Sequence, residues 1–414
     1  MERSATGIAP YRESERLVIL DFLRGLALFG ILIVNMSFYN SPIFSQSGGL
    51  SLWTDTPNQV TRMFIWFFFE SKFYPLFSLL FGIGFYLFMQ KAEESMRELT
   101  FRYRIRLAYL LLFGLLHVFL LWHGDILVVY AIFGFVMTWF RKSSNKTLIV
   151  TSVVFLLIPV MLTAAVVALI ELAKMLPEAA VEIESGFAGQ QEYIKERISM
   201  ALTTYSEGSY AEIFRMRLNE YSFVLGGVIF MFPNIISFFL IGIYMGRNRV
   251  FADPGTRLRR LRKLFLWSLP VALAFNAIYL YYASLGSFTT PDINLLLMIT
   301  GAIFGGASMM FVYLYLFTLM FHKGVFGRLG RVISTAGRMA FTNYLTQTII
   351  CTTIFYSYGF GLYGKVNYWQ GVIIAIMLFT IQLIWSHYWL KRFRFGPFEW
   401  LWRTLTYGKR QPMR

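Results

Sequence analysis

The sequence predicts an all-α fold: a polytopic membrane helix bundle of about ten transmembrane helices, with the N- and C-termini in the cytoplasm. Hydrophobic residues make up 57% of the 414 residues and charged residues only 14%, against roughly 45–50% and 25% in soluble domains. Apolar runs of about 20 residues recur along the whole chain, and each is long enough to cross the hydrocarbon layer. Basic residues concentrate in alternate loops, as they do when a chain crosses a membrane repeatedly.

Ten apolar runs are the expected transmembrane spans. We place them at 18–38, 71–90, 106–122, 125–140, 148–170, 222–246, 264–284, 295–321, 336–357 and 368–390. The segment 58–69 ends in aromatic residues before Glu70, and we expect it to lie at the membrane interface.

One transmembrane domain, 1–414, accounts for the chain, because no separate soluble stretch divides the apolar runs. The longest loop, 171–221, holds nine Glu and five basic residues, and its charges are spaced as on the faces of helices. We expect an extracytoplasmic helical loop there, which either covers the outer face as a lid or is simply solvated. The segment 391–414 is the expected cytoplasmic amphipathic tail.

The distribution of Lys and Arg predicts the orientation. Six segments hold 29 of the 38 basic residues: they are 1–17, 91–106, 141–146, 247–263, 323–338 and 391–414. The positive-inside rule places these segments, and with them both termini, in the cytoplasm. The net charge of +16 therefore reflects topology, and nucleic acid is excluded as a partner because no reading motif or polar basic domain accompanies the charge.

Polar side chains in the first span share one helix face. Asp21, Arg24 and Asn35 follow helical spacing together with Leu28 and Ile31, and charged groups within a span face the bundle interior. The Asp21–Arg24 pair indicates either a site for an anionic group, such as a cofactor phosphate or carboxylate, or a structural ion pair. Asn35 is a candidate substrate contact farther along the same face.

The third span carries a histidine, and a carboxylate follows it just after a turn. The run LLLFGLLHVFLLWHGDIL places His117 inside the span and Asp125 beyond its outer end. Histidine exchanges a proton near neutral pH, and a carboxylate on its other ring nitrogen fixes the tautomer. His117 is therefore a candidate catalytic acid or base, with a satisfied interhelical hydrogen bond as the alternative. His123, beside Trp122, either contacts substrate or faces lipid headgroups.

Two further polar pairs interrupt apolar runs. Glu70 and Lys72 stand at the outer start of the second span, where they could face an outer cavity and its substrate. In GRMAFTNYLTQT, Asn343 and Gln347 lie four residues apart on one helix face. Amides in that pattern either hydrogen-bond a neighbouring helix or form a polar wall that contacts a cofactor.

Other motifs carry no function. The single cysteine, Cys351, excludes an intrachain disulfide and a thiolate metal cluster, and we expect no metal. The run GFGLYGK at 359–365 resembles a phosphate-binding loop, but Val366 replaces the required Ser or Thr and no strand precedes the run. No metalloprotease or hydrolase nucleophile motif occurs.

Five ordered motifs carry a family resemblance. They are LDFLRGLALFGILIVN at 20–35, YPLFSLLFGIG at 74–84, H-x6-GDIL-x2-YA at 117–131, GRMAFTNYLTQ at 337–347 and GPFEWLWRTLTYG at 396–408. Together they resemble the YeiB-like family of bacterial membrane proteins, whose C-terminal part is a domain of unknown function. The resemblance covers nearly the whole chain.

The D-x-x-R-G motif of the first span extends the resemblance to an enzyme class. Through it the family is distantly similar to transmembrane acyltransferases such as heparan-alpha-glucosaminide N-acetyltransferase, which use cytoplasmic acetyl-CoA to acylate sugars across the membrane. The resemblance implies acyl transfer. The proposed catalytic histidine of those relatives lies between their first two spans, whereas residues 36–70 here contain none, so His117 would have to substitute.

The expected function is acyl transfer from a cytoplasmic acyl-CoA or acetyl-CoA to an extracytoplasmic hydroxyl or amine, with His117 and Asp125 as the catalytic pair. The side chains expected to hold the donor are Arg24, Asp21, Arg104, Arg106, Asn343 and Gln347. Those expected to contact the acceptor are Asn35, Glu70, Lys72 and His123. A transporter or exporter, and a non-catalytic lipid-binding protein, are the alternatives.

The expected location is the bacterial cytoplasmic (inner) membrane, which the chain would cross repeatedly. Membrane lipids and a small-molecule, glycan or lipid acceptor are the expected partners. A homodimer is left open.

Overall fold

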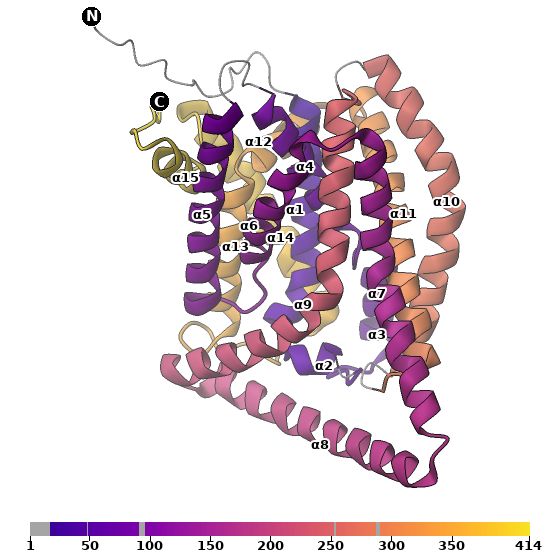
Figure 1. Cartoon of the computed structure of the whole chain (residues 1–414). Coiled ribbons are helices and arrows are strands. Elements are labelled where there is room, and N and C mark those ends of the chain that lie inside the picture. The colour runs from indigo at the N-terminus through magenta and orange to yellow at the C-terminus, as the bar shows by residue number, and fades with distance from the viewer. Residues whose placement is uncertain (1–16, 48, 91–95, 252–253, 287–289) are drawn as a thin grey trace, which may run out of the picture.

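The computed structural model describes residues 17–47, 49–90, 96–251, 254–286 and 290–414, and the regular structure in these ranges is helical throughout (Figure 1). The predicted all-α polytopic bundle is confirmed. The helices are α1 (Val18–Tyr39), α2 (Ile43–Ser47), α3 (Thr56–Phe68), α4 (Phe73–Met89), α5 (Met96–Leu120), α6 (Leu127–Met137), η2 (Thr138–Lys142), α7 (Asn145–Ala173), α8 (Pro177–Glu207), α9 (Tyr210–Arg247), α10 (Pro254–Ser284), α11 (Ile293–His322), α12 (Gly327–Arg338), α13 (Ala340–Phe355), α14 (Tyr368–Arg392) and α15 (Pro397–Tyr407).

Within these described ranges, seven helical segments are long and apolar enough to cross a membrane, and the two halves of α9 together make an eighth. Ten spans were expected, and the two that are missing are 125–140 and 336–357. The helices found there, α6 and α13, are too short to cross a membrane. The non-helical stretch 121–126 delays the start of α6, and a break at Met339 separates α13 from α12. The residues 336–338 therefore belong to α12.

Helix α1 lies at the centre of the bundle, where it packs against α4, α12, α13 and α14 (Figure 1). Two glycines let α12 approach it closely. A Cβ at Gly337 would lie 1.8 Å from the carbonyl oxygen of Asp21, and a Cβ at Gly25 would lie 2.4 Å from that of Ile333. This contact fixes the part of α1 that carries the Asp21–Arg24 pair.

The two ends of the bundle differ in structure. Helices α1 and α5 begin at one end, and α12 and α15 lie there as well (Figure 1). We call this end the basic face, because the Lys- and Arg-rich segments at the start of α5, in α12 and after α14 meet at it. At the opposite end, the α8 face, α8 runs across the bundle and packs against α2. Only the second half of α8 is anchored, through buried Ile194, Ile198, Ala201 and Tyr205.

A continuous apolar core joins α1, α4, α5, α6, α9, α13 and α14. The α10–α11 hairpin lies at the periphery, against α3, α4 and α7. Large apolar side chains on α10, such as Trp267 and Leu266, are exposed, as expected of a surface that faces lipid. The central helices, by contrast, enclose the polar groups described below.

Candidate functional site

A cavity of about 730 Å³ opens between α1, α4, α5, α6, α13 and α15. Its volume lies within the roughly 300–1,000 Å³ that is usual for small-molecule sites. Because α15 and the start of α5 line it, the cavity belongs to the basic face. We call it the basic-face cavity.

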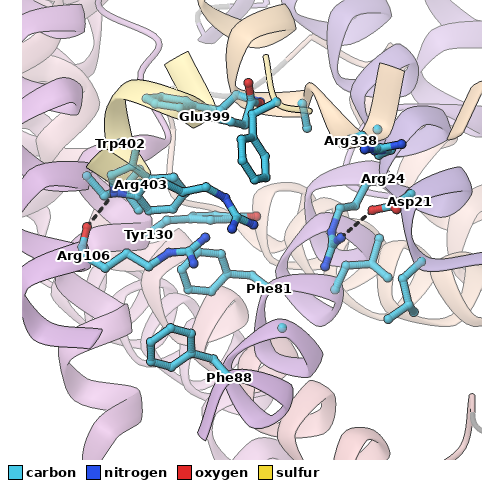
Figure 2. A pocket seen from close by; sticks show the side chains of 18 of the residues that line it. Asp21, Arg24, Phe81, Phe88, Arg106, Tyr130, Arg338, Glu399, Trp402 and Arg403 are labelled. Carbon is cyan, nitrogen blue, oxygen red and sulfur yellow. Dashed lines mark hydrogen bonds and ion pairs between the residues drawn. The ribbon is translucent and has the colours of Figure 1, made fainter. Parts of the chain in front are cut away.

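Arginines dominate the polar lining of the basic-face cavity. They come from five elements or tail segments and are Arg24, Arg106, Arg338, Arg394 and Arg403. The guanidinium groups of Arg24, Arg106 and Arg403 point toward the middle of the cavity (Figure 2). Asp21 and Glu399 are the acidic residues of the lining, so five positive charges face two negative ones. Guanidinium groups bind phosphate and carboxylate groups through paired hydrogen bonds, and this lining therefore suits an anion.

Local contacts hold two of these arginines in place. Arg24 Nη1 donates to Asp21 Oδ1 at 2.9 Å, one helical turn away on α1. The guanidinium of Arg106 lies 4.0 Å from the centre of the Trp402 ring, and the Trp402 indole donates to the backbone oxygen of Arg106 at 2.8 Å. The C-terminal helix α15 is thereby tied to α5 (Figure 2).

Glu399 connects α15 to the start of α13. Its Oε1 accepts hydrogen bonds from the backbone N–H groups of Phe341 (2.7 Å) and Thr342 (3.1 Å), and its Oε2 accepts one from Thr342 Oγ1 at 2.5 Å. The carboxylate thus satisfies amides that the first turn of a helix leaves unpaired. Burial nevertheless raises the pKa of Glu399 above its ordinary value, and these hydrogen bonds only partly oppose that effect.

The inner wall of the cavity is apolar and aromatic. Phe77, Phe81 and Phe85 of α4 line it together with Ile126 and Tyr344. The Tyr344 ring lies 5.2 Å from the His117 ring, centre to centre, and its hydroxyl donates to the backbone oxygen of Gly124 at 3.3 Å. Tyr344 therefore separates the inner end of the cavity from His117. Along α5, Arg106 and His117 are about 17 Å apart at 1.5 Å per residue.

His117 and Asp125 meet behind this wall. Their Nδ1 and Oδ1 atoms are 3.0 Å apart, although without the near-linear geometry of a hydrogen bond, and both side chains are fully buried. The other carboxylate oxygen of Asp125 accepts the backbone N–H of Val128 at 2.6 Å, which ties the carboxylate to the first turn of α6. The expected pair therefore exists: His117 comes from the last turn of α5 and Asp125 from the connection between α5 and α6.

The other ring nitrogen of His117 meets a hydroxyl that the sequence reasoning did not single out. His117 Nε2 lies 2.9 Å from Thr348 Oγ1, and Thr348 Oγ1 lies 2.7 Å from the hydroxyl of Tyr39. The result is a row of four buried groups: Asp125, His117, Thr348 and Tyr39. Thr348 is the last residue of GRMAFTNYLTQT and one turn beyond Tyr344, so helical spacing from Tyr344 was the available signal.

Aromatic side chains pack around this row on the side of the α8 face. The Tyr39 and Trp122 rings are 4.0 Å apart, centre to centre, and each residue is only 1% exposed. Tyr205, Tyr356 and Tyr363 form a further buried group in contact with one another. His117 is thus covered toward the α8 face, whereas the basic-face cavity approaches it from the other side.

His123 belongs to a second histidine–carboxylate pair. Its Nδ1 lies 2.9 Å from Glu220 Oε2 of α9, and the same oxygen accepts the Tyr205 hydroxyl at 2.5 Å. Both His123 and Glu220 are buried. His123 therefore faces the protein interior rather than headgroups, beside the Trp122 ring.

The remaining donor candidates lie outside the cavity. Asn343 Nδ2 donates to Ala336 O (3.1 Å) and Ser386 Oγ (3.0 Å), and Gln347 Nε2 donates to Gln382 Oε1 at 2.8 Å. These contacts join α13 to α14 and α12. Arg104 is exposed on α5 and does not line the cavity.

The remaining acceptor candidates do not line the basic-face cavity either. Lys72 is fully buried and donates to the backbone oxygen of Trp66 at 2.6 Å, with the Tyr279 ring 5.2 Å away. Glu70 interacts with Tyr279 and Lys72, so the two residues hold the α3–α4 junction against α10. Asn35 is half-buried on α1, beyond Ile31, the last residue of α1 that lines the basic-face cavity.

Comparisons with known proteins point to one family of uncharacterised proteins. The family model described as "Protein of unknown function (DUF418)" matches residues 245–409. "Uncharacterized protein YxaH" of Bacillus subtilis is 34% identical, and the alignment covers 99% of this chain and 98% of that protein. "Uncharacterized protein YeiB" of Escherichia coli is 27% identical, with 95% and 96% covered. No solved structure matches.

The fold and the buried site define a helical membrane protein with an arginine-lined cavity. The relationship to the YxaH protein extends over nearly the full length of both chains. The chain belongs to the YeiB-like (DUF418) family, a family of membrane proteins of unknown function. The matched C-terminal region contains α12, α13 and α15, and with them three of the cavity arginines and Thr348.

Proposed function

We propose that the protein is a membrane acyltransferase, which moves an acyl group from a coenzyme A thioester to an extracytoplasmic hydroxyl or amine. One observation carries the proposal: Tyr344, which lines the arginine-lined cavity on the basic face, is in ring contact with His117 of a buried histidine–carboxylate pair. The bacterial relatives and the basic segments support a location in the cytoplasmic membrane, with the basic face toward the cytoplasm.

The chemistry of the cavity fits a coenzyme A thioester. Its phosphates need cationic groups, which Arg106, Arg403 and Arg24 would supply. Its long arm and acyl chain need an apolar passage, which the phenylalanines of α4 would supply. A thioester at the inner end would then stand at Tyr344, next to His117.

His117 has the contacts that a general base requires. Asp125 at Nδ1 favours the tautomer in which Nε2 has a free lone pair, and Nε2 already faces a hydroxyl at 2.9 Å. A base within hydrogen-bond reach of the proton that it removes typically contributes about 10²–10⁴-fold to the rate. The acceptor is a small molecule, glycan or lipid with a hydroxyl or amine, and membrane lipids would surround the bundle.

Arg106 and Arg104 provide a matched test of donor binding. Both are on α5, but Arg106 lines the cavity and Arg104 does not. We expect Arg106→Gln to weaken acetyl-CoA binding about 10- to 100-fold, because a hydrogen bond to a charged group contributes about 1.5–3 kcal/mol. Arg104→Gln should bind like the wild type. Equilibrium dialysis of the purified protein against labelled acetyl-CoA and palmitoyl-CoA measures both.

Three outcomes separate the candidate functions. Binding of either thioester that depends on Arg106 supports the acyltransferase. Equal loss in the Arg106→Gln and Arg104→Gln variants would move the donor site elsewhere. Absence of binding to both thioesters, with uptake of a solute into sealed vesicles, would favour a transporter.

A further inference from the structure

We propose that Thr348 is the nucleophile of the site and carries the acyl group as a covalent ester between donor and acceptor. The inference rests on the proposed acyltransferase function and goes beyond it, because it divides the transfer into two half-reactions. Thr348 would take the acyl group from the side of the basic-face cavity and release it later to the acceptor.

The geometry is that of a nucleophile, a base and an orienting acid. Thr348 Oγ1 lies 2.9 Å from His117 Nε2, and His117 Nδ1 lies 3.0 Å from Asp125 Oδ1. A hydroxyl within about 2.6–3.2 Å of a base that a third group orients is the recurring signature of an activated nucleophile. The three side chains come from α13, α5 and the α5–α6 turn, so the arrangement depends on the fold and not on adjacency in the sequence.

The hydrogen-bond directions agree with this role. With the ring proton on Nδ1, the nitrogen that lies 3.0 Å from Asp125 Oδ1, the Nε2 lone pair is free to accept the Thr348 hydroxyl. The same hydroxyl lies 3.4 Å from the backbone oxygen of Tyr344, a longer contact than the 2.9 Å to Nε2. The Thr348 oxygen can then accept a hydrogen bond from the Tyr39 hydroxyl, 2.7 Å away. Tyr39 is thereby placed to donate a hydrogen bond to an oxygen at this site. Trp122 Nε1, next to Tyr39, is buried and has no hydrogen-bond partner among the described residues.

The position of Thr348 explains why a covalent step is useful here. Tyr344, one turn earlier on α13, lines the cavity. A donor bound in the cavity would therefore reach the same helix that carries Thr348. Toward the α8 face the site is covered by the Tyr39–Trp122 stack. With a covalent intermediate, donor and acceptor need not occupy the site together, and the two sides of the membrane need not be connected at any time.

The two half-reactions balance. In the first, the Thr348 oxygen forms a bond to the acyl carbon, the carbon–sulfur bond breaks, and the hydroxyl proton passes through His117 to the leaving thiolate, which gives free coenzyme A. In the second, the acceptor oxygen or nitrogen forms a bond to the acyl carbon and the ester bond to Thr348 breaks. His117 removes the acceptor's proton and returns it to the Thr348 oxygen.

The test uses the full-length protein in detergent with acetyl-CoA and palmitoyl-CoA and no acceptor. Intact-mass spectrometry should show one acyl adduct per chain, peptide mapping should place it on Thr348, and about one equivalent of free coenzyme A should appear. Thr348→Val, which keeps the shape of the side chain, should abolish the adduct and the released coenzyme A. Thr348→Ser should keep both.

Thr346→Val is the matched control. Thr346 lies on the same helix two residues earlier, and its hydroxyl donates to the backbone oxygen of Thr342. This variant should acylate like the wild type. His117→Gln should bind the thioesters and acylate at least 100-fold more slowly, since it lacks the base.

The outcomes are distinct. An adduct on His117, on Tyr39 or on Cys351, three residues beyond Thr348, would overturn the assignment. Thioester binding without any adduct would also overturn it and would leave the acyltransferase proposal standing, with direct transfer. Absence of thioester binding would remove the proposed function and this inference together.

Discussion

Glu399 shows how one side chain couples the C-terminal helix to the site. Its carboxylate contacts the backbone of Phe341 and Thr342 at the start of α13, and Tyr344 and Thr348 follow on the same helix. It also reduces the net positive charge of the basic-face cavity, which it lines. Ionisation of this residue should therefore affect both stability and the preference of the cavity for anions.

The raised pKa of Glu399 predicts a pH dependence of stability. Because its pKa is raised in the folded protein, Glu399 favours folding when it is protonated. This contribution to stability is complete below the unfolded-state pKa, near 4.5, and is lost as pH rises through the folded-state pKa. Glu399→Gln keeps the shape without this loss. We expect the melting temperature of Glu399→Gln, relative to the wild type, to increase between pH 4 and pH 8, by roughly 1–3 °C per unit by which the pKa is raised.

Thermal unfolding in detergent, followed by tryptophan fluorescence, measures that difference. Glu192→Gln is the control, because Glu192 is 79% exposed on α8, and its difference from the wild type should stay flat. A difference that falls with pH for Glu399→Gln would mean that the capping hydrogen bonds outweigh the burial.

Part of the site could be predicted residue by residue. Asp21, Arg24 and Arg106 line the cavity, and His117 contacts Asp125, because intramembrane charge and helical spacing are local signals. Thr348 was missed because threonine is common within apolar helices, where its burial costs far less free energy than that of a charged side chain, so it does not stand out in the sequence. Arg338, Arg394 and Arg403 were missed as site residues because they belong to segments read only as cytoplasmic loops and tail, and only tertiary packing brings them together.

The α1–α12 contact is the element-scale feature on which the cavity depends. Gly337, in the last turn of α12, packs against the carbonyl oxygen of Asp21 in the first turn of α1. We expect Gly337→Ala to destabilise the protein by about 1–3 kcal/mol or more, because the backbone cannot move cheaply to accept a methyl group. Thioester binding should weaken as well, since α12 carries Arg338. Melting temperature and equilibrium dialysis measure the two effects.

Gly189→Ala is the opposite case. A Cβ at Gly189 of α8 would meet nothing within 4 Å, and alanine is the better helix former by about 0.8–1 kcal/mol. This variant should leave the melting temperature unchanged or raise it. If both variants behaved alike, the closeness of α1 and α12 would not control stability.

Helices could be predicted from the sequence where the length of an apolar run alone determines them. Long apolar helices such as α1, α11 and α14 follow from hydrophobic runs. Helix α12 lay within a segment assigned as a loop, since its glycines and arginines suggest one, although Ile333 and Ala336 form a buried stripe. The starts of α6 and α13 depend on caps and turns, which a search for apolar runs does not detect.

At the scale of the whole molecule, the orientation can be tested directly. In a Cys351→Ala background, Lys391→Cys should react with a membrane-impermeant maleimide only in inside-out vesicles, because it lies on the basic face. Glu192→Cys on α8 should react in intact cells. Both positions are exposed, so accessibility from the two sides reports topology. The reverse pattern would place the arginine-lined cavity outside the cell.

The aromatic stack of Tyr39 and Trp122 has an electrical consequence. Where water fills the basic-face cavity, it brings the electrical potential of that side of the membrane close to His117, and the membrane voltage then falls mainly across the short packed region toward the α8 face. A unit charge that crosses the whole drop changes energy by about 2.3 kcal/mol per 100 mV. Any movement of a proton or charged acceptor through that packed region would therefore feel most of the membrane voltage over only a few side chains.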